Sequence, residues 1–136
     1  MTWTAFRRGA MWLTALLILG TTGVIGIRNA IAERTDAITI MQQSVTAGVF
    51  LYGVLGVVAA GGLAMRRHWS VRAAMAWLVP ITYVPGAAAV AYGNAGIGAA
   101  LVASVSSSLV GAGVVWMTHA VTRASEVSRS AGRQRG

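Results

Sequence analysis

The sequence contains no cysteine and no lysine, and it has few acidic residues. Without cysteine the chain has no disulfide framework, no thiolate ligand for a metal ion and no cysteine nucleophile. Glu33, Asp36 and Glu126 are its only carboxylates, and the motifs of phosphate-binding loops, zinc proteases and serine hydrolases are missing from it. We therefore expect no enzymatic activity, no cofactor and no metal site.

Charge is scarce along the whole chain. Charged residues make up 10 % of its 136 residues and hydrophobic residues 56 %, whereas a soluble domain usually has about 25 % charged residues. Residues 9–27, 37–65 and 73–122 carry no acidic or basic side chain apart from His119. A charge at the centre of a bilayer costs about 2.5 to 3.5 kcal/mol, so such runs are typical of segments in lipid. The composition predicts an integral membrane protein.

The length of the uncharged runs predicts how often the chain crosses the bilayer. A helix needs about 20 residues to cross, and one helix over residues 73–122 would extend about 75 Å. That run must turn back on itself, and residues 92–96 contain the glycines and asparagine that break helices. The polar residues at the start of 37–65 place its span later. The predicted spans are 10–27, 44–65, 73–92 and 97–118.

These spans define the expected fold class. Residues 1–122 form an all-α transmembrane domain, in which four helices make two antiparallel hairpins and pack as a bundle. Residues 123–136 are rich in serine, glycine and arginine, and they have too little apolar surface to fold alone. They are predicted to be a basic, flexible cytoplasmic tail.

The positions of the arginines predict the orientation. In this topology nine of the eleven arginines fall on the side of the two termini, and only Arg28 and Arg34 fall on the other side. Because cytoplasmic segments carry the excess of positive charge, we expect both termini in the cytoplasm. Arginine as the only long basic residue, with abundant alanine and glycine, indicates a GC-rich bacterial genome and hence a bacterial inner membrane. Tryptophans at or near the same helix ends are expected at the headgroup level: Trp12, Trp69, Trp77 and Trp116.

The same arginines predict contacts with membrane lipids. Anionic headgroups attract an arginine near the surface by roughly 1 kcal/mol, whereas a nucleic-acid site needs more cationic or aromatic density than this chain has. We therefore expect lipid partners and no nucleic acid. The expected headgroup contacts are Arg66, Arg67, Arg72 and Arg123.

A cleaved signal peptide is an alternative reading of the N-terminal region. Arg7 and Arg8 precede an apolar run, and residues 30–32 (Ala-Ile-Ala) resemble a cleavage site. The apolar run is longer than the usual 7 to 15 residues of a signal sequence. A retained first helix is therefore the prediction.

Small residues recur at helical spacing within the spans. Membrane helices approach closely where such residues lie at the contact, so these rows are expected to be faces for helix packing or for a partner. The rows in the fourth span are Ala99, Ala103, Ser107 and Gly111, and Ala100, Ser104, Ser108 and Ala112. The second span offers Gly53, Gly56 and Ala60. Each face packs either within the bundle or against another subunit.

The third span contains both prolines of the chain, Pro80 and Pro85. Each proline removes a backbone donor from a helix, which predicts a bent or broken helix. The hydroxyl groups of Thr82 and Tyr83 are expected to bond the freed carbonyl groups or to face a small polar cavity. This region is either a packing kink or a solute site. Its expected hydrogen-bonding partners are Tyr52 and the serines Ser106, Ser107 and Ser108.

Three functions remain for a chain of this kind, and the least favoured is a membrane enzyme or sensor, because the loops contain almost no catalytic groups. The prediction is a non-catalytic accessory or assembly subunit, which presents helix faces to a larger membrane complex or to a copy of itself. The alternative is a small oligomeric channel or carrier for a neutral or apolar solute, with the segment from Pro80 to Pro85 lining the path. The spans hold no acidic or basic residue, which disfavours a proton-coupled pump.

Overall fold

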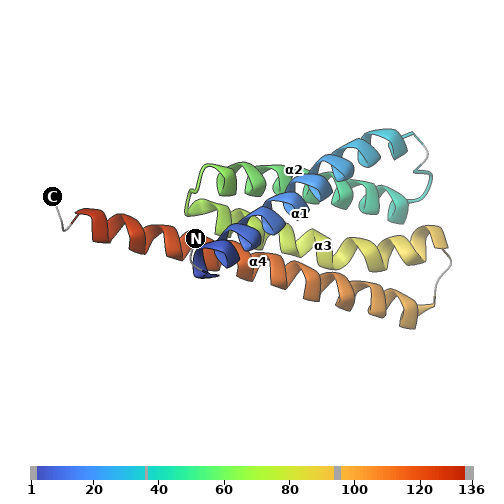
Figure 1. Cartoon of the computed structure of the whole chain (residues 1–136). Coiled ribbons are helices and arrows are strands. Elements are labelled where there is room, and N and C mark those ends of the chain that lie inside the picture. Colours follow the sequence, from blue (N-terminus) through green and yellow to red (C-terminus); the bar gives the residue numbers. More distant parts are fainter. Residues whose placement is uncertain (1–2, 36, 94–95, 134–136) are drawn as a thin grey trace.

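A computed structural model of the chain describes residues 3–35, 37–93 and 96–133, without the side chains of Trp3, Glu126 and 128–133. All regular secondary structure in these residues is helical (Figure 1). Each helix is long and apolar enough to cross a membrane, which confirms the all-α class and the four apolar helices. The helices are α1 (Trp3–Glu33), α2 (Ile40–Ala64), α3 (Trp69–Gly93) and α4 (Ile97–Arg133).

A capping box starts α2. The side chain of Thr39 accepts a hydrogen bond from the backbone N–H of Gln42 at 3.2 Å, and the side chain of Gln42 accepts one from the backbone N–H of Thr39 at 3.1 Å. The two bonds satisfy donors that a helix start otherwise leaves without partners. Because polar residues suit a first helical turn, α2 begins at Ile40, before the predicted start of the span at residue 44.

A Schellman motif ends α2. The backbone N–H of Arg66 donates to the Leu63 carbonyl at 3.0 Å, and that of Arg67 donates to the Gly62 carbonyl at 2.9 Å. Arg66 has a φ of 52°, in the left-handed region that glycine usually provides at this position. The motif leads the chain directly into α3.

The two prolines do not break α3. The helix continues from Trp69 to Gly93 through Pro80 and Pro85, so the expectation of a broken helix is wrong, and a bend stays a prediction. Each proline removes one backbone hydrogen-bond donor, but the helix is continuous on both sides of each proline. The predicted turn after α3 lies partly outside the described residues, between Gly93 and Gly96.

α4 continues past the predicted span. It extends to Arg133, so the helix includes most of the segment that the composition predicted as a tail. After Gly113 this segment contains neither proline nor glycine until Gly132, and nothing in its backbone chemistry stops a helix earlier. Its flexibility stays a prediction.

The helices pack mainly against their neighbours in the chain. α2 contacts α1 and α3, and α3 contacts α2 and α4. α1 also contacts α4, but less extensively than it contacts α2. Met11 of α1 and Trp116 of α4 line one cavity at this contact. Figure 1 shows α1 crossing the bundle, with its start beside the late part of α4. The early part of α4 therefore has α3 as its main neighbour.

Two apolar clusters form the core. One surrounds Trp77, which is 1 % exposed, and includes Leu19 from α1 and Leu63 from α2. The other joins α1, α2 and α3 around Val45 and Val84. Trp77 is thus buried between helices, and its position at the headgroup level stays a prediction.

α1 and α2 approach each other until their backbones touch. A Cβ atom added at Gly23 would lie 2.7 Å from the backbone nitrogen of Val57. One added at Gly53 would lie 2.7 Å from a backbone nitrogen of α1, and one at Gly56 would lie 2.9 Å from a carbonyl oxygen of α1. Only a hydrogen atom fits at these positions, so the three glycines determine how close the helices come.

This contact predicts the effect of adding a single methyl group. Gly53→Ala should destabilise the protein by about 1 to 3 kcal/mol, because the backbones of two helices must separate to admit the Cβ atom. Gly61→Ala is the matched control on the same helix, since a Cβ atom there meets nothing within 4 Å. Thermal unfolding in mild detergent measures both variants, and equal stabilities would contradict the contact.

Candidate functional site

Small residues from both predicted rows of α4 pack against α3. A Cβ atom added at Gly86 of α3 would lie 2.8 Å from the carbonyl oxygen of Ala100 and would collide with the side chain of Ser104. Further along α4, a Cβ atom at Gly111 would lie 3.2 Å from the side chain of Ile81. These predicted small residues thus bring two helices of the same chain together.

The small residues of α2 also face a helix of the same chain. Gly53 and Gly56 lie against α1, and a Cβ atom at Gly20 of α1 would lie 3.9 Å from that of Ala60. All three residues of α2 are buried. The small residues of α2 therefore pack against α1, and the α3-facing small residues of α4 pack against α3, within the described structure.

Other small residues of α4 are left uncovered. Ala99 and Ala112 are exposed, whereas Ala103 and Ser107 are partly buried. A further stripe, which we call the heptad stripe, consists of Ala99, Ser106 and Gly113, spaced by seven residues.

Seven-residue spacing keeps the heptad stripe on one side of the helix. Ala99 and Ser106 are exposed, and a Cβ atom at Gly113 meets nothing within 4 Å. The rows predicted at a spacing of four residues include Ala99 but not Ser106 or Gly113. A spacing of seven joins all three residues in the sequence.

The polar groups between the two prolines bond to different neighbours. Thr82 donates its hydroxyl proton to the Leu78 carbonyl at 2.9 Å. The Ser108 hydroxyl of α4 lies 3.1 Å from the Thr82 hydroxyl as a donor, and it also lies 2.7 Å from the carbonyl oxygen of Ser104. Tyr83 is directed to α2, where its hydroxyl lies 3.2 Å from that of Ser44. The two side chains therefore tie α3 to separate helices rather than facing one common space.

The predicted partners of this region are confirmed only in part. Ser108 does contact Thr82, but Tyr52 packs with its ring against Gly26 of α1, where an added Cβ atom would lie 2.7 Å away. The hydroxyl of Thr82 bonds the Leu78 carbonyl and not the carbonyls freed by the prolines, those of Ala76 and Ile81. A threonine in a helix bonds most readily to the carbonyl four residues before it, which explains the difference.

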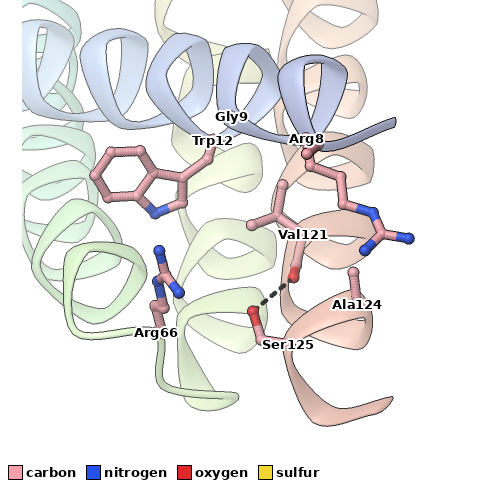
Figure 2. A pocket seen from close by; sticks show the side chains of 8 residues that line it. Arg8, Gly9, Trp12, Arg66, Val121, Ala124 and Ser125 are labelled. Atoms are coloured by element: carbon pink, nitrogen blue, oxygen red, sulfur yellow. Dashed lines mark hydrogen bonds between the residues drawn. The ribbon is translucent and has the colours of Figure 1, made fainter. Parts of the chain in front are cut away.

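A basic cavity lies at the end of the bundle where α1 begins and α2 ends. It has a volume of about 470 Å³, and Arg8, Trp12 and Arg66 are among the residues that line it (Figure 2). Trp12 donates from its indole nitrogen to the Leu63 carbonyl at 3.1 Å. Sequence reasoning named Arg66 as a headgroup contact but missed Arg8. All four of the predicted contact residues have exposed side chains: Arg66, Arg67, Arg72 and Arg123.

The contact between Thr82 and Ser108 predicts a small coupling energy. A double-mutant cycle combines Thr82→Val and Ser108→Ala and measures the free energy of unfolding in detergent. The coupling energy between the two residues should be about 0.6 kcal/mol, the average for hydrogen bonds between membrane helices. Ser106→Ala, at an exposed position, should combine additively with Thr82→Val. A coupling well above about 1.7 kcal/mol, the largest such value, would contradict a packing role for this pair.

Comparison with known proteins adds no assignment to this geometry. Neither the family models, nor the curated proteins, nor the solved structures gave a match to the chain. Within the described residues, no three histidine, cysteine, aspartate or glutamate side chains are grouped so that they could hold a metal ion. The helix faces and the basic cavity are the features from which a function can be inferred.

Proposed function

We propose that the chain spans a bacterial inner membrane four times, as two antiparallel hairpins with both termini in the cytoplasm. Its role there is that of a non-catalytic accessory or assembly subunit, which packs against partner helices of a larger complex or of its own copies. The proposal rests on the surface of the helices and above all on the uncovered side of α4.

The exposed surface supports membrane insertion. Large apolar side chains lie outside on every helix, among them Leu17 at 57 %, Phe50 at 48 %, Val79 at 72 % and Leu109 at 70 % exposure. A surface of this kind promotes aggregation in water, but lipid tails are as apolar as these side chains. Lipid is therefore the environment in which this surface is stable.

The position of the helix ends supports the antiparallel arrangement. Trp12, near the start of α1, bonds to Leu63 near the end of α2, and the same basic cavity includes Ser125 from the late part of α4. The arginine-rich segments of the chain thus lie at one end of the bundle. By the positive-inside rule this end faces the cytoplasm.

The single observation that carries the assembly role is the exposure of α4. In its most apolar stretch 11 % of the residues are buried, compared with 39 % in α2. Small residues at a helix surface allow a second helix to approach closely, and the heptad stripe provides them on this uncovered helix. The polar groups of Thr82 and Tyr83 already have partners within the chain, which favours packing over transport of a solute.

The assembly role predicts that the heptad stripe is sensitive to bulk. Ser106→Leu should weaken association of the chain with its partner roughly tenfold or more, because an overpacked helix contact costs about 1 to 3 kcal/mol. Gly113→Leu should act in the same way, since a Cβ atom at this position meets nothing within 4 Å. Native mass spectrometry after gentle extraction identifies what remains bound and distinguishes a second copy from another protein.

The matched control is Ala76→Leu, which adds the same bulk at an exposed position of α3. It should leave the assembly unchanged. The proposal fails if the extracted chain is a monomer without any bound protein, or if Ser106→Leu and Gly113→Leu assemble as well as the control does.

A further inference from the structure

We infer that the basic cavity is a discrete binding site for the phosphate of an anionic phospholipid. Arg8 and Arg66 hold the phosphate, and Trp12 forms part of the wall. The inference rests on the proposed membrane insertion, but it goes beyond a general attraction of arginines to headgroups. It specifies one site, formed by residues from three separate segments, and one chemical group that binds there, a phosphate.

The geometry places two cationic groups around one space. In Figure 2 the Arg66 side chain extends toward Trp12, while Arg8 lies on the other side of Val121 and its guanidinium group is directed away from Arg66. The volume of about 470 Å³ is in the range of small-ligand pockets. Gly9 of α1 also lines the cavity, and a Cβ atom there would meet nothing within 4 Å, so this wall leaves the space open.

The charges in the cavity call for an anion. None of the described residues that line it is acidic. Neither guanidinium group forms a hydrogen bond or an ion pair with any residue in the described ranges. A guanidinium group offers planar paired donors that match two phosphate oxygens, so a phosphate bound in the cavity would give these unpaired positive charges an anionic partner.

The backbone of Arg66 supports a role for its side chain. Its φ of 52° is unusual for a residue other than glycine, and glycine would form the same Schellman motif without strain. Strained positions occur where a side chain is needed for another reason. The side chain of Arg66 lines the cavity from this turn. The turn lies beside Trp12, because the indole nitrogen of Trp12 donates to the carbonyl of Leu63, three residues before Arg66.

A lipid fits the surroundings better than a free phosphate. Arg8 also lines a second cavity of about 310 Å³, which adjoins the first and includes Met11 and Trp116. Trp116 is 58 % exposed, and exposed tryptophan at this level is typical of the membrane interface. A phosphate held by Arg8 would thus have an apolar wall beside it for the glycerol and acyl chains of a phospholipid.

The test is a titration of the full-length chain in mild detergent with phosphatidylglycerol, followed by native mass spectrometry of the bound lipid. We expect one phosphatidylglycerol to bind far more tightly than phosphatidylcholine, whose choline group offsets the phosphate charge. Arg8→Gln and Arg66→Gln should each weaken this binding about tenfold or more, the loss of a charge-assisted contact. Arg67→Gln is the matched control, since it removes the same charge one residue outside the cavity.

Two further variants separate binding from stability and from charge. Arg66→Gly should bind as poorly as Arg66→Gln, while its thermal unfolding temperature stays at or above that of the parent chain because the strained φ is relieved. Gly9→Leu keeps every charge but fills the cavity, and it should also lose the lipid. A folded Gly9→Leu variant that binds like the parent would overturn the site.

Other results would also overturn the inference. Equal losses in Arg66→Gln and Arg67→Gln would show a delocalised attraction instead of a site. Binding of inorganic phosphate that depends on Arg8 and Arg66, without binding of phosphatidylglycerol, would make it a site for a free anion. The outcome is independent of the assembly role, because the spectrum reports lipid and protein partners as separate mass differences.

Discussion

The backbone contact between α1 and α2 is the constraint on which the arrangement of the helices depends. Gly23, Gly53 and Gly56 let these helices touch, and no larger residue could occupy their places without separating them. From this contact α1 crosses the bundle, and it reaches α4 only near its own start (Figure 1). The early part of α4 is left with α3 as its main neighbour, and its small residues and exposed apolar residues remain available.

The same arrangement gives the two ends of the bundle different chemistry. At one end α1 begins, α2 turns into α3 and the late part of α4 passes by, and the basic cavity forms between them. At the other end the only arginines among the described residues are Arg28, near the end of α1, and Arg34, directly after α1. The proposed orientation and the proposed lipid site follow from this difference between the ends, and the proposed partner contact at the heptad stripe follows from the uncovered side of α4.

Much of the fold was predictable because a helix that crosses a membrane requires a whole segment without charged residues. Four helices follow from uncharged runs of suitable length. The start of α2 at Ile40 was not predicted, although Thr39 followed by Gln42 has the spacing of a capping box. Which small residues meet which helix was not predictable from one span alone. Ser104 contacts α3 because Gly86 lies opposite, and Trp77 is buried in a cluster with residues from the other three helices. The left-handed Arg66 gave no sequence signal, since glycine is the usual residue there.

The central claim is that these helices cross a membrane with the arginine-rich end inside, and cysteine labelling tests it most directly. The chain has no cysteine of its own, so single variants report on single positions. A membrane-impermeant maleimide applied to intact cells, or to spheroplasts where an outer membrane is present, should label Ile38→Cys and Gly96→Cys. It should label His68→Cys, in the turn between α2 and α3, only after the membrane is opened. Labelling of His68→Cys in intact spheroplasts together with Ile38→Cys would contradict the account.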